Sequence, residues 1–95
     1  MIERHVTFEV FSDKTQAFEK LFGEEYRPAM VSMSGFIKVD LLREQGKPNI
    51  YQMVIRFESA EYAAGWRASP EHQSLSPKLK SLYSESQLQV YEVIP

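Results

Sequence analysis

Trp66–His72, which reads WRASPEH, decides the fold together with the alternating run that precedes it, Tyr51–Phe57. Apolar side chains occupy every second position of that run, which predicts a strand with one face on a core. Trp66 then closes a short helical segment. The Ser-Pro pair at Ser69 predicts a new helix, since serine is a preferred N-cap and proline suits the first helical position. A strand, a short helix and a second helix therefore follow one another closely.

Three further strands and a long helix are predicted on either side of this stretch. The sequence alternates over residues 3–11 and 36–43, and a turn-rich segment, 44–49, joins the second of these to the run above as a hairpin. Apolar residues near helical spacing predict an amphipathic helix over residues 17–33, and a last strand is expected over 88–94. The order is β-α-β-β-α-β. The fold class is therefore α+β, with a ferredoxin-like antiparallel sheet.

Local signals predict where the helices begin and where they break. Asp13 and Gln16 have the spacing of a capping box. Gly23 and Pro28 interrupt the long helix, and Pro28 should kink or split it because proline removes a backbone donor. A second Ser-Pro pair, at Ser76, predicts another helix start.

The composition excludes several classes of function. A chain of 95 residues makes one domain, residues 1–95. The net charge is −2 with acids and bases interspersed, which argues against nucleic-acid binding. The chain has no cysteine, and this excludes disulfides, thiolate catalysis, zinc–thiolate sites and iron–sulfur clusters. No signal region or membrane-spanning run is present, so we expect a cytoplasmic protein with no membrane partner.

One face of the predicted sheet is polar. With this element order, helices cover only the other face. A face in contact with water would have this composition. So would a face packed against the same face of a second copy across a two-fold axis, with opposite charges matched. The residues concerned are His5, Thr7, Glu9, Lys38, Asp40, Gln52 and Arg56, interspersed with Leu42 and Val54.

Taken in order, these features resemble the antibiotic biosynthesis monooxygenase family of dimeric α+β barrels. The features are the first strand, the long helix ending at Gly35–Phe36, the hairpin, the helix with Trp66, the motif Ser69–His72 and the last strand. The likeness covers nearly the whole chain. It implies a homodimer in which two sheets pack into a barrel. The family includes cofactor-free oxygenases, heme degraders and proteins of unknown role.

Among these activities, cofactor-free oxygenation of a quinol or anthrone fits best. An electron-rich phenol or anthrone, once deprotonated, can pass an electron to dioxygen without metal or flavin. The protein then supplies a dry aromatic pocket, a base and orienting donors. The resemblance thus implies a small aromatic molecule and dioxygen as partners, and no cofactor. Four scattered glycines are also too few for a dinucleotide fingerprint.

The heme-degrading branch fits poorly. Its members resemble one another in an Asn on the first strand and in a heme-ligating His about ten residues beyond the Trp. The only Asn of this chain is Asn49, in a predicted turn. The position ten residues beyond Trp66 is Ser76.

Trp66 and His72 are the candidate catalytic residues. The resemblance implies that Trp66 walls an aromatic-substrate pocket, and the alternative is an aromatic anchor in the core. His72 lies three residues after the Ser69 cap, where the helix dipole disfavours a protonated ring. A neutral imidazole would suit a general base. The alternative is a capping or surface histidine.

Four further residues are candidates for substrate binding. Tyr26 and Tyr62 are favoured because a buried hydroxyl requires a hydrogen-bonding partner. Phe22 fits a pocket wall or the ordinary core. Arg67 either clamps an anionic substrate or is a solvated cation at a helix end.

No metal site is expected, because the chain has only two histidines, His5 and His72, and no paired spacing. The second functional hypothesis is a non-catalytic small-ligand-binding or sensing dimer of the same fold. A pocket filled by Phe22 and Met30 would favour that hypothesis. An open cavity lined by Trp66 or His72 is what an enzyme requires.

Overall fold

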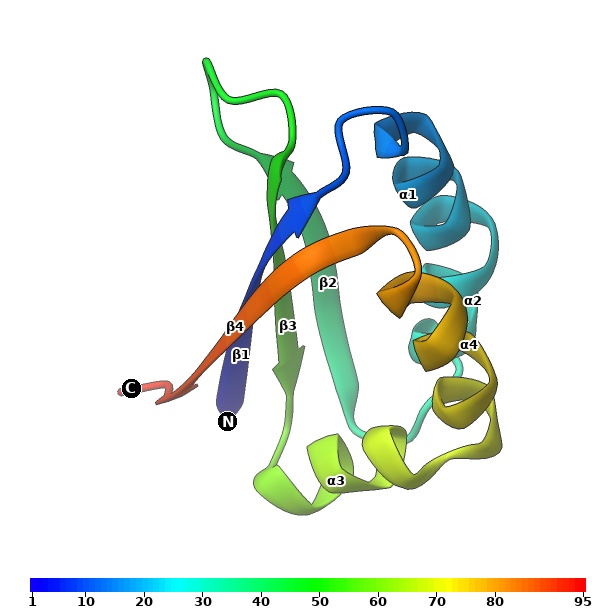
Figure 1. Ribbon diagram of the computed structural model, residues 1–95. Coiled ribbons are helices and arrows are strands. Elements are labelled where there is room, and N and C mark those ends of the chain that lie inside the picture. Colours follow the sequence, from blue (N-terminus) through cyan, green and yellow to red (C-terminus); the bar gives the residue numbers. More distant parts are fainter.

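The computed structural model describes all residues, Met1–Pro95, as a four-stranded antiparallel sheet with helices on one face (Figure 1). The strand order is β2-β3-β1-β4, which confirms the ferredoxin-like arrangement. The strands are β1 (Ile2–Val10), β2 (Phe36–Arg43), β3 (Ile50–Phe57) and β4 (Tyr83–Glu92). The helices are α1 (Thr15–Leu21), the π-helical η1 (Phe22–Tyr26), α2 (Arg27–Val31), α3 (Ala60–Ala68) and α4 (Pro70–Lys80).

The long helix is interrupted near Gly23 and Pro28, as predicted, but it does not split at the proline. A π-helical turn, η1, lies just before the proline, and there the Arg27 N–H bonds to the carbonyl of Phe22, five residues back. The wider turn carries the chain into α2, where Pro28 occupies the first turn and needs no donor. The predicted capping box is also absent. Lys14 is the N-cap, and no side chain caps α1.

Serines cap both α3 and α4, and the cap at Ser69 confirms the prediction made for it. Ser59 Oγ accepts a hydrogen bond from the Tyr62 N–H at 3.3 Å, and Ser69 Oγ accepts one from the His72 N–H at 3.1 Å. The helix start expected at Ser76 is wrong, because α4 continues through Pro77 to Lys80. The buried side chains of α4 flank this proline, and packing of that face on the sheet outweighs one lost backbone bond.

The last strand begins five residues earlier than predicted, at Tyr83 rather than Leu88. Its first half is polar and shows no alternation. Pairing with β1 orders it nonetheless, with Phe8 opposite Ser86 and Val6 opposite Leu88. β4 is an edge strand in which almost every residue is exposed. For that reason the hydrophobic pattern gave no signal here.

The core lies between the inner face of the sheet and the helices. The predicted apolar face of β3 is confirmed, since Tyr51, Met53, Ile55 and Phe57 are all buried. They pack with buried side chains of η1, α2, α3 and α4, among them Phe22, Tyr26, Met30, Trp66, Leu75 and Leu79.

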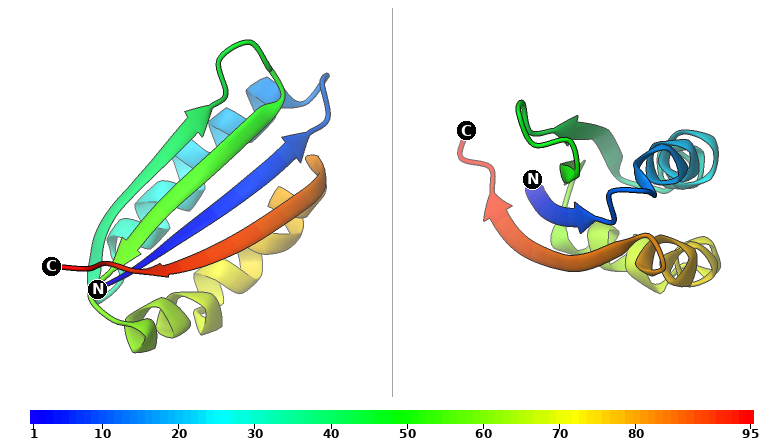
Figure 2. Two further views of the ribbon diagram at one scale, coloured as in Figure 1. Left: turned by 90° about the vertical axis from the view of Figure 1, so that its left-hand side faces the viewer. Right: turned by 45° about the horizontal axis from the view of Figure 1, so that its top comes forward.

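The opposite face of the sheet is uncovered (Figure 2). The register of β1 and β3 pairs Glu3 with Arg56 and Thr7 with Gln52 on this face. Arg56 donates to Glu3 at 2.7 Å. This open face is as polar as the sequence predicted. Separately, none of the helices is both long and apolar enough to cross a bilayer, and the cytoplasmic location stays a prediction.

Candidate functional site

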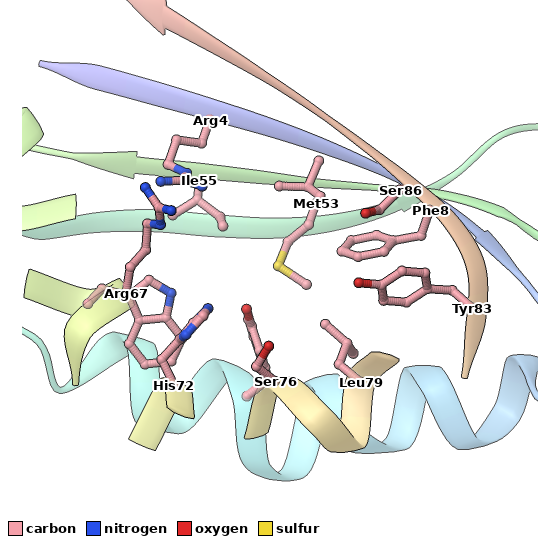
Figure 3. A pocket seen from close by; sticks show the side chains of 13 residues that line it. Arg4, Phe8, Met53, Ile55, Arg67, His72, Ser76, Leu79, Tyr83 and Ser86 are labelled. Atoms are coloured by element: carbon pink, nitrogen blue, oxygen red, sulfur yellow. The ribbon is translucent and has the colours of Figure 1, made fainter. Parts of the chain in front are cut away.

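A cavity of about 130 Å³ lies between the inner face of the sheet, η1, α3 and α4 (Figure 3). Its walls come from segments far apart in the sequence. Its residues are Arg4, Val6, Phe8, Tyr26, Met53, Ile55, Trp66, Arg67, His72, Ser76, Leu79, Tyr83 and Ser86. The cavity is open rather than filled, and neither Phe22 nor Met30 lines it.

Three aromatic rings meet edge-on at one part of this wall. Trp66 is 3% exposed, and its ring centroid lies 5.4 Å from that of Tyr26 and 5.1 Å from that of His72. The Tyr26 and His72 centroids are 6.3 Å apart. Interplanar angles of 86° and 83° about Trp66 are the edge-to-face geometry that aromatic rings prefer. Trp66 is thus both a core residue and a cavity wall.

The hydroxyl of Ser69 links the backbone of Trp66 to the backbone of His72. Ser69 lies in the sharp link between α3 and α4 and is buried. Its Oγ donates to the carbonyl of Trp66 at 2.6 Å and accepts from the N–H of His72 at 3.1 Å. The sequence motif Ser69–His72 therefore does more than begin a helix. It joins the backbone that carries the indole to the backbone that carries the imidazole.

His72 has an environment that disfavours its protonated form. Burial lowers the pKa of its imidazole, and the positive charges of Arg67, Arg4 and Lys80 lower the pKa further. No protein group forms a hydrogen bond with either ring nitrogen. The ring is therefore neutral at neutral pH and free to accept a proton from a ligand. The helix-dipole argument anticipated neutrality, but burial is the leading cause.

Arg4 is the only charged residue of the cavity that was not predicted from the sequence. It lies on the inner side of β1, in the alternation that continues through Val6 and Phe8. Burial and the neighbouring charge of Arg67 lower the pKa of Arg4. A charged residue in the apolar register of a strand was the available signal, because such a position normally faces a core.

Two hydroxyl groups of tyrosine add hydrogen-bonding capacity. Burial raises the pKa of Tyr26 to about 12, so this side chain is a neutral phenol at neutral pH. Tyr83 lies at the other end of the cavity, close to Phe8, at a ring-centroid distance of 5.0 Å. Figure 3 shows Arg4, Arg67 and His72 at one end, and Phe8, Tyr83 and Ser86 at the other.

The structure brings together Trp66, His72, Tyr26 and Arg67, and it leaves two predicted residues outside the cavity. Tyr62 is 43% exposed and packs over Gly35 on the outer side of α3. Its helical spacing from Trp66 turns it to a different side. Phe22 is buried behind Tyr26, with ring centroids 6.4 Å apart. Neither side chain lines the cavity. For Phe22 this is the alternative left open from the sequence, a place in the ordinary core.

Metal-binding side chains do not gather at the cavity. No group of three or more His, Cys, Asp or Glu side chains converges in the structure. His5 lies on the open face of the sheet, where its Nε2 is 2.7 Å from a carboxylate oxygen of Glu3.

Comparison with known proteins gives a consistent result. The family model for antibiotic biosynthesis monooxygenase matches residues 1–77. No curated protein matches the chain. Among solved structures, the chain is similar to a Nitrosomonas europaea protein provisionally assigned to the same family, with 17% identity, complete coverage of both chains and a TM-score of 0.89.

Two further structures are similar over nearly their whole length. SnoaB, a cofactor-independent oxygenase from Streptomyces nogalater, has 20% identity, with 99% of this chain and 93% of that chain covered and a TM-score of 0.89. A conserved protein from Methanosarcina mazei has 19% identity, 95% and 89% coverage and a TM-score of 0.87. At such identities the structural likeness establishes the fold alone.

Proposed function

Because the chain belongs to the antibiotic biosynthesis monooxygenase family, we propose that it oxidises a quinol-like aromatic small molecule with dioxygen and without a cofactor. The observation that carries the proposal is the open cavity in which a neutral imidazole, His72, stands edge-on to a buried indole, Trp66. A reaction of this kind needs a base in a dry aromatic site, because the deprotonated substrate itself supplies the electrons.

His72 is the proposed base. Its lowered pKa leaves the ring unprotonated at neutral pH, and its unpartnered nitrogens can accept the proton of a substrate hydroxyl. The resulting anion passes one electron to dioxygen, which gives a substrate radical and superoxide. The two radicals join in a carbon–oxygen bond. Loss of water then leaves one oxygen atom on the ring, so that a hydroquinone and dioxygen give a hydroxyquinone and water.

Trp66 is the proposed wall that orients the aromatic ring and excludes water. It is almost fully buried, and its contacts with Tyr26 and His72 fix its plane. The phenol of Tyr26 remains protonated and can donate to a substrate oxygen. Orientation of this kind is a large part of what a site without a cofactor can contribute.

The size of the cavity supports a substrate with a single ring. A cavity of about 130 Å³ is comparable to apolar protein cavities of about 150 Å³ that accept benzene. The three fused rings of an anthrone exceed it. We therefore propose a single-ring quinol in place of the broader class of quinols and anthrones that the resemblance implied.

We further propose that the working protein is a homodimer that pairs the open faces of two sheets. Support comes from the uncovered face, which carries charges of both signs and a half-exposed Leu42. Such a face is self-complementary across a two-fold axis.

Oxygen uptake by the purified protein tests the proposed function. We expect uptake above the spontaneous rate with single-ring hydroquinones, and we expect His72→Ala and Trp66→Phe each to abolish most of the acceleration. Removal of a general base typically lowers a rate by about two to four orders of magnitude. Lys20→Gln, which changes an exposed side chain of α1 away from both the cavity and the open face of the sheet, should keep the wild-type rate.

Two outcomes would contradict the proposal. Uptake that persists in both cavity variants would remove His72 and Trp66 from the reaction. Binding of an aromatic ligand without any uptake would favour the non-catalytic binding module.

A further inference from the structure

The two arginines of the cavity have no carboxylate partner. Neither Arg4 nor Arg67 takes part in any of the salt bridges of the chain, and no Asp or Glu lines the cavity. In contrast, Arg56 and Arg43 are each paired with a glutamate. Arg4 is half-buried, whereas Arg67 is exposed at the end of α3. A cation withdrawn from water without a counter-charge destabilises the fold, so an unpaired one in a cavity indicates a missing anion.

The two guanidinium groups point to the same place. Figure 3 shows those of Arg4 and Arg67 meeting at one end of the cavity, the end at which His72 also lies. Their proximity disfavours the charged form of Arg4, since the charge of Arg67 lowers the pKa of Arg4. Like charges held together in a concave site repel one another until an anion binds between them.

The opposite end of the cavity is aromatic. Phe8 and Leu79 supply apolar surface there, and Tyr83 and Ser86 supply hydroxyl groups. The cavity therefore has a cationic end and an aromatic end with polar atoms at its edge. A ligand that matches both ends carries an oxyanion on one side of a ring and hydroxyl substituents on the other.

We propose that Arg4 and Arg67 together bind the carboxylate of a single-ring aromatic acid, so that the ligand of this site is a hydroxylated benzoate. A carboxylate offers two oxygens and about four acceptor positions, which two planar guanidinium forks can share. A phenolate offers only one oxygen. The ring of such an acid is benzene-sized, as the cavity of about 130 Å³ requires.

The ligand class deepens the proposed oxygenase function, and the binding itself does not depend on it. A hydroxyl next to the carboxylate would lie near His72, which adjoins the two arginines. A second hydroxyl across the ring would lie near Tyr83 and Ser86. 2,5-Dihydroxybenzoate, which is a quinol that carries a carboxylate, has both features.

Trp66 provides the measurement, because it is the only tryptophan and lines the cavity. Titration of its fluorescence with benzoate and with benzamide compares an anion with a neutral molecule of nearly the same shape. We expect benzoate to bind about tenfold or more tightly than benzamide, the ratio that charge-assisted hydrogen bonds give. Arg4→Met should remove this preference, and Arg4→Lys should keep only part of it because lysine lacks the planar fork.

Arg27→Met is the matched control. Arg27 is exposed, forms no salt bridge and does not line the cavity, so this variant removes the same charge and should keep the preference. If Arg4→Met fails to fold, Arg67→Met tests the same anion from the exposed end of α3.

Several results would overturn the proposal. They are equal affinity for benzoate and benzamide, no fluorescence change with either ligand, or a preference for benzoate that survives in both Arg4→Met and Arg67→Met.

Different results would refute the oxygenase function and the carboxylate-binding site. A preference for benzoate without oxygen uptake on 2,5-dihydroxybenzoate leaves the acid site intact and refutes the oxygenase. Oxygen uptake with the same KM for neutral hydroquinone as for the acid refutes the acid site alone.

Discussion

His72 is the residue on which the proposed chemistry depends most. Its place after Ser69 follows from the sequence, and so does a neutral ring. The main causes of its lowered pKa cannot be predicted from the sequence, because burial and the proximity of Arg67 and Arg4 arise from tertiary packing. Folding thus places His72, part of a helix-capping motif, where its imidazole is neutral and can act as the proposed base.

The pKa of His72 can be followed by NMR titration of the imidazole protons. We expect it below the ordinary histidine value of about 6.5. Since Arg67 is the largest charge contribution, Arg67→Met should raise this pKa towards its ordinary value. His5→Gln assigns the two imidazole signals. An ordinary pKa in the wild type, or no change in Arg67→Met, would contradict the electrostatic account of the site.

Some residues of the cavity could be predicted from the sequence and others could not, and the difference has physical reasons. Trp66 and His72 belong to a local motif, and that motif places them together. Arg4 required knowledge of what faces the first strand across the core. Tyr62 was misplaced because an aromatic on a helix near Trp66 fits a pocket until the direction of its side chain is known.

At the scale of elements, the link between α3 and α4 positions the site. Ser69 connects the Trp66 carbonyl to the His72 N–H, whereas Ser59 only caps α3. We expect Ser69→Ala and Ser59→Ala each to destabilise the fold by about 1 kcal/mol, as loss of an N-cap does.

These two variants separate capping from positioning when urea denaturation and oxygen uptake are both measured. Ser69→Ala should lower the rate and Ser59→Ala should not, while Ser69→Thr keeps the hydroxyl and should restore activity. If both alanine variants lower activity equally, Ser69 has no role beyond stability.

A second prediction at this scale concerns Gly35, which lies in the link between α2 and β2. Gly35 has φ +77°, and a Cβ there would lie 2.2 Å from the Tyr62 ring. Gly35→Ala should therefore destabilise the fold by at least about 1–2 kcal/mol from the left-handed conformation alone. Tyr62→Ala should relieve part of the loss.

Gly65→Ala is the control for this variant. Gly65 lies inside α3 with open space around it, so alanine there should stabilise the fold by about 0.5–1 kcal/mol. Unfolding in urea measures all of these variants. A Gly35→Ala protein as stable as the wild type would show that the turn tolerates an ordinary residue.

Most elements were predictable, and the errors share one cause. The strands with buried alternating residues, β1, β2 and β3, were found within a residue or two. The π-helical turn, the helix through Pro77 and the early start of β4 were not. In each of these places tertiary packing or strand pairing prevails over a local propensity.

At the scale of the whole molecule, the uncovered sheet face governs assembly. The chain has a mass of 11.1 kDa, and the proposed homodimer predicts about twice that value in light scattering after size-exclusion chromatography. Leu42 is 50% exposed on the open face, so Leu42→Glu should shift the mass towards the monomer.

Val31→Glu is the matched control for assembly. Val31 is 51% exposed on α2, on the helical side of the molecule, and this variant should leave the mass unchanged. A wild-type protein that elutes as a monomer would refute the homodimer.

The cavity is also a property of the whole molecule. Its walls come from β1, η1, β3, α3, α4 and β4, which only the completed fold brings together. Local patterns therefore pointed to the fold and to four of the cavity residues, Trp66, His72, Tyr26 and Arg67, but not to the size of the cavity or to the pair of arginines that makes one end cationic. Those two properties are what narrow the proposed substrate to a single-ring acid.

Reaction with isotopically heavy dioxygen tests the central claim most directly. With 2,5-dihydroxybenzoate as substrate, mass spectrometry of the product should find one heavy oxygen atom on the ring in the wild type, with the second released as water. His72→Ala should yield no labelled product above the protein-free control. A product without the label, or equal labelling in His72→Ala, would contradict an oxygenase that works through this cavity.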